Sequence, residues 1–244
     1  MKLREFLALL DSISPFELQE KWDNSGLQVG DPNKEVSRVY ASIDLDSETI
    51  EWLEPGSVIV THHPLIFGKL SSLSYDSYPA KLLVKLIQKD IAHIAMHTNF
   101  DKTHLNSYVA KKVLGVEPRC EEFVCLFEKE GSFDEIVAWV SQKLGLVCPR
   151  VVERKEAIRT IALTTGSGGS LIGSFQADCF LSGDLKYHDA IKAKELGIGV
   201  IDIGHFESER YFAQALREQL KKHQIEAIIA PIKTPIKVWN ETVH

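Results

Sequence analysis

The chain has 244 residues, of which 44% are hydrophobic and 25% are charged, and its formal net charge at pH 7 is −6. These are the values of an ordinary globular protein, so they exclude intrinsic disorder, collagen-like repeats and a coiled coil. The negative charge disfavours nucleic acid as a partner, because non-specific binding to a polyanion depends on basic surfaces. No apolar run approaches the ~18 residues of a membrane-spanning helix, so a membrane is not expected as a partner either.

The N-terminal segment and the cysteines both indicate a cytoplasmic protein. Glu5 and Asp11 bracket an apolar run that is too short for a signal peptide, so an amphipathic helix is predicted there. No two cysteines form a C-x-x-C pair, and those in apolar segments read as parts of strands. We therefore predict free, buried thiols in a reducing compartment at Cys120, Cys125, Cys148 and Cys179.

Short apolar runs alternate with helical patterns along the whole chain. In chain order, strands are predicted over residues 38–45, 57–61, 91–96, 123–127, 158–163, 179–181, 199–203 and 227–230. Helices are predicted over residues 47–53, 79–89, 102–114, 133–144, 185–196 and 205–222. This alternation predicts an α/β fold of layered sheets and helices, divided near Pro118 into a first lobe over 1–118 and a second lobe over 119–244.

The strongest local pattern is Thr61-His62-His63-Pro64, which follows the apolar strand expected over 57–61. In α/β sheets, ligands gather beyond the carboxyl ends of the strands. Side chains alternate along a strand, so the two imidazoles share a site only if the strand has ended, as Pro64 favours, or else they reach different ions. Metal ligation competes here with a surface pair or with one buried, hydrogen-bonded histidine.

Two further patterns also follow predicted strands. His97 and Asp101 come after the strand over 91–96, where His97 suits a ligand, a partner of a ligand or a proton donor. Asp101 precedes a predicted helix, so an N-cap is its commoner role, although a carboxylate there can also bridge two cations. His205 and Glu209 are four residues apart and share one helix face, which suits either a cation or a surface pair.

Together these patterns offer three imidazoles and two carboxylates at strand ends: His62, His63, Asp101, His205 and Glu209. They are too many ligands for one closed tetrahedral ion, and they suit two divalent cations bridged by a carboxylate. Nitrogen and oxygen ligands without thiolate are compatible with zinc, iron, manganese, nickel or cobalt.

Two loops in the second half of the chain allow either a structural or a functional interpretation. The glycine-rich segment 166–169 precedes a short helix, so its amides suit either a phosphate cradle or a plain tight turn. Asp184 is predicted to cap the helix over 185–196. His188 in that helix is a candidate proton donor, with a surface position as the alternative.

Four blocks occur in a fixed order over nearly the whole chain: Lys-Trp-Asp-Asn-Ser-Gly-Leu-Gln-Val-Gly at 21–30, Thr-His-His-Pro at 61–64, His-Thr-Asn-Phe-Asp at 97–101 and Gly-His-Phe-Glu-Ser-Glu at 204–209. In order and spacing they resemble the dinuclear-metal family of GTP cyclohydrolase 1 type 2 homologues, also called Ngg-one-interacting-factor-three-like proteins. The chain departs from the family after Asp101, where Lys102 to Asn106 replace a glycine-rich helix start.

The resemblance implies a fold, a ligand set and an assembly. The metal ligands of this chain would be His62, His63, Asp101, His205 and Glu209, with Asp101 or Glu209 bridging two divalent ions. The fold would have two interlinked α/β lobes with the metal site at the strand carboxyl ends between them. The assembly would be a toroidal homohexamer.

The resemblance also implies an activity, the conversion of GTP into 7,8-dihydroneopterin triphosphate with release of formate. A nearby imidazole, His97 or His188, would protonate the ring nitrogen as the guanine ring opens. Two alternatives remain open from the residues alone. One is another metal-dependent hydrolase, such as a phosphoesterase or an amidohydrolase, and the other is a non-enzymatic metal-binding or adaptor protein.

Overall fold

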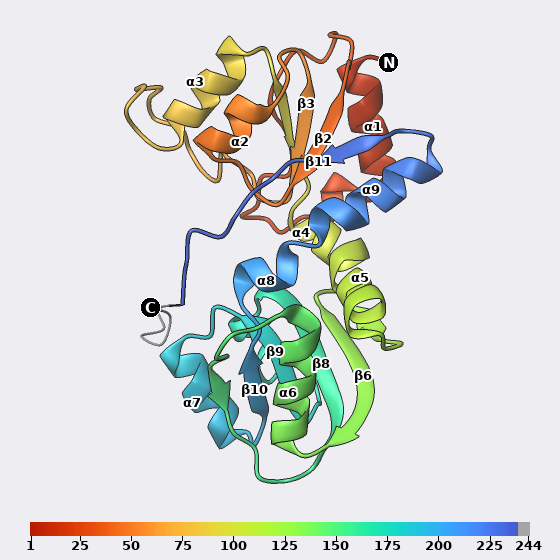
Figure 1. Ribbon diagram of the computed structural model, residues 1–244, viewed down its shortest axis with the longest axis vertical. Helices are drawn as coiled ribbons and strands as arrows, with labels where there is room; N and C mark the ends of the chain where they lie inside the picture. The colour runs from red at the N-terminus through yellow and green to blue at the C-terminus, as the bar shows by residue number, and fades with distance from the viewer. Residues whose placement is uncertain (239–244) are drawn as a thin grey trace, which may run out of the picture. The chain divides into compact units, whose positions relative to one another are not determined.

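A computed structural model describes residues 1–238 of the chain. The protein has the predicted mixed α/β fold, with two sheets and helices packed against them. It divides into two compact units (Figure 1). The first contains Met1–His104 and Arg210–Ile232, and the second contains Leu105–Glu209 and the described residues 233–238.

The first unit is built on a five-stranded sheet with the strand order β1-β4-β3-β2-β11. The strands are β1 (Gly26–Val29), β2 (Val39–Ser42), β3 (Val58–Thr61), β4 (Ala92–Ala95) and β11 (Ala227–Ile229). All of them run parallel except β1, which pairs antiparallel with β4 at the edge. Thr61 at the end of β3 lies in register with Ser42 of β2 and Ala95 of β4, so three parallel strands end together.

Helices complete the core of the first unit. They are α1 (Leu3–Ile13), η1 (Phe16–Leu18), α2 (Ser47–Trp52), α3 (Ala80–Gln88) and α9 (Phe212–Lys222). The N-terminal segment is an amphipathic helix, as predicted, because Leu3, Phe6 and Leu10 recur at helical spacing and are buried. Side chains of α2 and α3 form one cluster with Tyr40 and Ile59 of the sheet. Figure 1 shows α2 and α3 side by side, and α9 contacts β2 and β11.

A helical stretch over residues 98–114 leads the chain from the first unit into the second. It consists of α4 (Thr98–Phe100), the π-helical η2 (Asp101–Leu105), α5 (Asn106–Tyr108) and the π-helical η3 (Val109–Leu114). Gly115 ends it in the left-handed conformation, with φ of 76°, which confirms the predicted stop. The stretch begins four residues earlier than the predicted start at Lys102, so Asp101 lies inside it and the N-cap interpretation of Asp101 was wrong.

The second unit is built on a six-stranded sheet with the order β5-β6-β8-β9-β10-β7. The strands are β5 (Arg119–Glu121), β6 (Val124–Gly131), β7 (Val151–Val152), β8 (Ile158–Ser167), β9 (Cys179–Gly183) and β10 (Gly199–Asp202). The neighbours β8, β9 and β10 run parallel. The helices are α6 (Phe133–Leu144), α7 (Tyr187–Glu195) and α8 (His205–Glu209), with a short 3-10 turn η4 (Gly169–Leu171).

Two helix predictions in the second half need correction. The single helix predicted over 205–222 is broken, because α8 ends at Glu209 and α9 begins at Phe212. This break is also where the chain leaves the second unit for the first. Asp184 does not cap α7, whose N-cap is Lys186; instead Asp184 occupies the preceding turn with φ of 53°.

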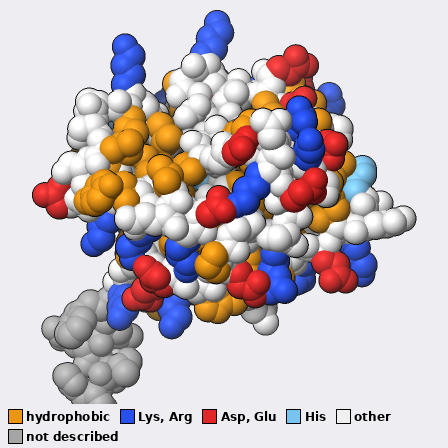
Figure 2. Space-filling model, turned by 90° about the horizontal axis from the view of Figure 1, so that it is seen from above, with side chains coloured by type: hydrophobic (Ala, Val, Ile, Leu, Met, Phe, Trp, Pro, Cys, Tyr) orange, Lys and Arg blue, Asp and Glu red, His pale blue; other side chains and the backbone are white. Residues whose placement is uncertain are grey.

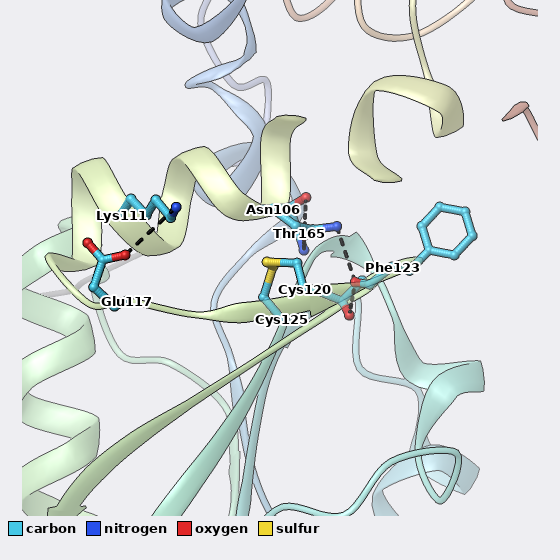
Figure 3. The surroundings of a disulfide bond; sticks show 8 residues. Asn106, Lys111, Glu117, Cys120, Phe123, Cys125 and Thr165 are labelled. Carbon is cyan, nitrogen blue, oxygen red and sulfur yellow. Dashed lines mark hydrogen bonds and ion pairs between the residues drawn. A yellow bond between two sulfur atoms is a disulfide. The ribbon is translucent and has the colours of Figure 1, made fainter. Parts of the chain in front are cut away.

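The cysteine prediction is confirmed at only one position. Cys120 and Cys125 face each other across the β5–β6 hairpin and form a disulfide (Figure 3), so they are not free thiols. Cys148 is free but exposed, whereas Cys179 is free and buried in β9. Burial raises the pKa of the Cys179 thiol to about 12. The pair was missed because only the hairpin register places the two residues opposite each other.

Across the described residues, no helix is long and apolar enough to span a membrane. On the face drawn in Figure 2, basic and acidic side chains alternate among the described residues and do not gather into a basic surface.

Candidate metal centre

The candidate ligands of the first unit lie where its parallel strands end. Asp44 follows β2, His62 and His63 follow β3, and His97 follows β4. These three strands are neighbours in the sheet and run parallel, so their carboxyl ends present these side chains at one edge. The strand ends before His62, which lets both adjacent imidazoles take part in the site.

The three imidazoles converge. His62, His63 and His97 each offer a ring nitrogen within 4.8 Å of the other two. In each ring, Nδ1 faces an oxygen acceptor: the Met96 carbonyl at 3.0 Å from His62, Asp44 at 2.9 Å from His63 and Asp23 at 2.7 Å from His97. An acceptor at Nδ1 favours the tautomer with the proton on Nδ1, in which Nε2 is the nitrogen that can ligate a metal.

Asp101 adds a carboxylate to this group. Its Oδ1 lies 3.4 Å from Nε2 of His62, and both side chains are buried or nearly so. Asp101 stands in the π-helical turn η2, where the widened backbone turn changes the direction of the side chains. Such π-helical turns occur frequently at functional sites.

His97 is oriented by a network from the segment before β1. Asp23 accepts from Nδ1 of His97 and from the backbone amide of Thr98, and it also contacts the Thr98 hydroxyl. Ser25 accepts from the backbone amide of His97 at 3.1 Å. Burial opposes ionisation of Asp23, but the hydrogen bond and charge of His97 outweigh it and hold the pKa of Asp23 well below its usual range.

The second unit carries a similar arrangement. His205 and Glu209 lie on one face of α8, as their spacing predicted, and Nε2 of His205 is 2.9 Å from Oε2 of Glu209. Nδ1 of His205 is 2.7 Å from Asp184, which follows β9. Both ring nitrogens of His205 therefore face a carboxylate. A protonated imidazole satisfies this geometry, and so does a divalent cation between Nε2 and Glu209.

Glu209 is buried against a glycine. A Cβ at Gly166 would lie 2.0 Å from Oε1 of Glu209, so only glycine leaves room for this carboxylate. Gly166 also has φ of 63°, a conformation that other residues adopt at a cost. Ser208 fixes the same turn, because its hydroxyl accepts from the Gly166 amide at 3.0 Å.

The glycine-rich loop at 166–169 forms a tight turn. The amide of Gly168 donates to the Ser182 hydroxyl at 2.8 Å, and that of Gly166 is already used by Ser208. A Cβ at Gly169 would lie 2.3 Å from an oxygen of Asp189, so a negative charge already occupies this position. Of the two interpretations of the loop, the tight turn therefore agrees with the structure better than a phosphate cradle.

The donor sets fit divalent transition metals. Each unit offers imidazole nitrogen and carboxylate oxygen, the mixed ligands that zinc, iron, manganese, nickel and cobalt accept. The first unit gathers His62, His63 and His97 in one group and sets Asp101 against His62. His97, predicted as a proton donor or a ligand, thus lies among the ligand candidates. His188 is exposed in the first turn of α7, where its ring contacts Tyr187.

Sequence reasoning missed three carboxylates that hold these rings. The sequence predicts Asp44 inside a strand and Asp184 at a helix cap, while Asp23 enters only as part of the block at 21–30. Asp44 and Asp184 each come one or two residues after a parallel strand, which is the signal that could have identified them. Asp23 reaches His97 from a distant segment, and no local pattern reveals that pairing.

Comparison with known proteins gives a single family over nearly the full length. The Duf34/NIF3 (NGG1p interacting factor 3) family model matches residues 1–235. The GTP cyclohydrolase 1 type 2 homolog of Campylobacter jejuni is 46% identical over 241 residues, which are 98% of this chain and 100% of that protein. The GTP cyclohydrolase 1 type 2 of Helicobacter pylori is 39% identical over 239 residues, with 97% and 98% covered.

Solved structures agree with this result. A Staphylococcus aureus protein superposes with a TM-score of 0.87 at 29% identity, covering 98% of this chain and 99% of that one. Reduced HcgD from Methanocaldococcus jannaschii has a TM-score of 0.79 at 28% identity, with 95% and 98% covered.

Proposed function

The chain belongs to the Duf34/NIF3 family, and from that premise we propose that it is a dinuclear-metal-dependent hydrolase of the GTP cyclohydrolase I type. It converts GTP and one net water into 7,8-dihydroneopterin triphosphate and formate. The names of two relatives, GTP cyclohydrolase 1 type 2 and its homolog, support the substrate class. The observation that carries the proposal is the set of imidazoles whose Nδ1 atoms are each held by an oxygen.

In this proposal, the ligand clusters of the two units act on the same pair of ions. The residues that would hold these ions are His62, His63 and Asp101 from the first unit and His205 and Glu209 from the second, and Asp101 or Glu209 would be shared between the ions. When bound, two divalent cations supply Lewis acidity and a hydroxide nucleophile at neutral pH. The residues around them fix the rings: Asp44 orients His63, and Asp184 orients His205.

His97 is the first candidate for moving a proton. Its ring lies among the other imidazoles, and Asp23 behind it stabilises the positive charge that a proton donor carries. In the proposal, His97 protonates the guanine ring nitrogen as the bond to C8 breaks. His188 remains the second candidate, although its exposed position supports it less.

The direct test is turnover by protein of defined metal content. Chelated protein is reloaded in turn with zinc, iron, manganese, nickel or cobalt and incubated with GTP, and formate and pterin fluorescence are measured. We expect both products from at least one metal form, with loss of turnover in His62→Ala and Glu209→Ala. His223→Ala, at an exposed position after α9, is the matched control.

Other outcomes of this test reject the assignment. Turnover that persists unchanged in both ligand variants would remove the metal centre from the mechanism. Hydrolysis of a phosphoester or amide panel without pterin would indicate a different metal-dependent hydrolase. Bound metal without hydrolysis of GTP or of the panel would indicate a metal-binding or adaptor protein.

The role of His97 is separable from that of a ligand. We predict that His97→Ala keeps the metal content of the wild type and loses turnover by ~100-fold or more, as expected for a lost general acid. Metal analysis and formate release on the same preparation check this. Loss of one ion per chain would instead make His97 a ligand.

We further propose that the chain assembles as a homohexamer, the assembly that its family resemblance implies. Light scattering after size-exclusion chromatography should give about six times the chain mass of 27.4 kDa. A mass of one or two chains would reject this assembly without affecting the metal proposal.

A further inference from the structure

A cavity of about 380 Å³ lies beside His63 in the first unit. Much of its wall is apolar, formed by Leu45, Pro79 and the segment 64–67. The polar or charged side chains that line it besides His63 are Asp44, His93, Lys69 and Tyr78. Cavities with apolar walls and a few polar groups are typical binding sites for small planar molecules.

The hydrogen bonds of His93 fix its tautomer. The Thr61 hydroxyl donates to the His63 carbonyl at 2.6 Å, so Oγ1 of Thr61 must accept from Nε2 of His93 at 2.7 Å. The proton of the neutral ring therefore sits on Nε2, and Nδ1 is an acceptor. Burial keeps the ring neutral by lowering the pKa of His93 to about 3.

Nδ1 of His93 lacks a hydrogen-bond donor among the described residues. The side chain of His93 is completely buried. A buried polar atom without a partner costs free energy, so such an atom usually marks a place for a ligand or water. His93 is one of the residues that line the cavity, so this acceptor belongs to the cavity wall.

Asp44 supplies further acceptors in the same cavity. One of its oxygens takes the Nδ1 proton of His63, and a carboxylate offers about four acceptor positions in total. Partial burial and then the negative charge of Asp44 raise the pKa of Tyr78, which lines the same cavity. Tyr78 therefore adds an aromatic side chain to the lining that contains these acceptors.

We propose that this cavity is the base-recognition subsite, and that it selects a planar heterocycle whose edge carries two adjacent N–H donors. The guanine edge has this pattern, with the N1 proton next to the 2-amino group. The adenine edge presents an acceptor at N1 and would leave one of the two protein acceptors unpaired. The subsite deepens the proposed function and rests on it, because it places the base beside the candidate ligand His63.

The probes for a test are nucleotides that cannot be ring-opened. The 7-deaza analogues of GTP, ITP and ATP lack the N7–C8 imine, so binding is measured without turnover. ITP analogues keep the N1 proton and lack the 2-amino group. By calorimetry on the metal-loaded protein, we expect 7-deaza-GTP to bind at least tenfold more tightly than 7-deaza-ITP, with 7-deaza-ATP weaker still.

One variant locates the recognition in this cavity. His93→Phe removes the acceptor and is expected to reduce the preference for 7-deaza-GTP over 7-deaza-ATP to less than threefold, while metal content stays at the wild-type level. His223→Phe is the control, because that histidine is exposed and follows α9. The nucleotide series on the wild type decides the question if His93→Phe fails to fold.

The results separate this inference from the proposed function. Preference for 7-deaza-GTP without formate release would leave the subsite intact and reject the hydrolase. Formate release with equal binding of the three analogues would leave the hydrolase intact and overturn the subsite. Tighter binding of 7-deaza-ATP, or failure of all three analogues to bind, would also overturn it.

Discussion

Glycine at position 166 leaves room for the carboxylate of Glu209. A side chain there would collide with Oε1 of Glu209 at 2.0 Å. We predict that Gly166→Ala displaces Glu209 and lowers metal affinity by at least tenfold. Calorimetric titration of the chelated variant with metal measures this change in affinity.

Gly56→Ala is the matched control for Gly166→Ala. Gly56 has φ of 75°, similar to the 63° of Gly166, but a Cβ there would meet nothing within 4 Å. Both variants therefore pay the cost of a left-handed residue, about 1–2 kcal/mol of stability. An equal loss of metal affinity in the two variants would show that backbone strain causes the loss. It would contradict the prediction that the loss comes from displacement of Glu209.

The carboxylate behind His205 is predicted to tune metal affinity. Asp184→Asn keeps a residue that tolerates the positive φ of 53° and removes the charge that orients the ring. We expect metal affinity to fall by about 10–100-fold. The control is Asp90→Asn, because Asp90 is an exposed aspartate with φ of 55°. This variant should keep the metal affinity of the wild type. An unchanged affinity in Asp184→Asn would exclude this role.

Some residues of the candidate site can be identified from sequence and others cannot. His62 and His63 stand out because a buried strand ends directly before them, and His205 and Glu209 because their spacing places them on one helix face. Asp184 could not be identified as the partner of His205, because an aspartate before a helix is usually a cap. Only the tertiary fold pairs residues 21 positions apart.

The helical stretch over 98–114 carries a half-buried titratable ring. His104 in η2 stacks on Phe100 with the ring centroids 4.9 Å apart. Burial, followed by the charge of Lys222, lowers the pKa of His104 to about 4. The unfolded chain, with a histidine pKa near 6.5, therefore binds this proton more readily than the native state.

This shift predicts a pH dependence of stability. As pH falls from about 6.5 toward 4, the unfolded state gains the proton first, so the native state loses stability. We expect His104 to account for about 1–2 kcal/mol of loss between pH 7 and 5. Urea unfolding of chelated wild type and His104→Asn at both pH values measures it: the variant should lose less stability on acidification. Identical losses would contradict the assignment.

At the level of elements, hydrophobic patterning identified most of the described strands and helices, but it missed the edge strands β1, β5 and β7. The runs before His62, His97 and His205 became β3, β4 and β10 because burial on both faces selects continuous apolar segments. The break between α8 and α9 was missed, because the helical pattern continues through Arg210 without glycine or proline. The π-helical turns were missed too, since hydrogen-bond register leaves no compositional signal.

At the level of the whole molecule, chain order distributes the ligand candidates over two units. Residues 1–104 bring His62, His63 and Asp101, while His205 and Glu209 lie at the end of the segment 105–209 of the second unit, just before the chain returns to the first at Arg210. The proposal requires both clusters to hold the same ions. A ligand that binds only the native state stabilises it by mass action.

Metal removal is therefore predicted to lower the thermal midpoint of the whole protein. At a free metal concentration 100 times the dissociation constant, binding adds about 2.7 kcal/mol. Calorimetric melting of chelated and reloaded protein should show one shifted transition. A shift confined to part of a split transition would indicate that one unit binds metal alone.

Metal content per chain tests the shared centre most directly. Elemental analysis after loading and extensive dialysis is made on the wild type, on His63→Ala in the first unit and on His205→Ala in the second. We predict two ions per chain in the wild type and a loss of at least one ion in each variant. The double variant, which carries both His63→Ala and His205→Ala, should lose no more than these two ions. Two ions retained by either single variant would contradict a centre built from both halves of the chain.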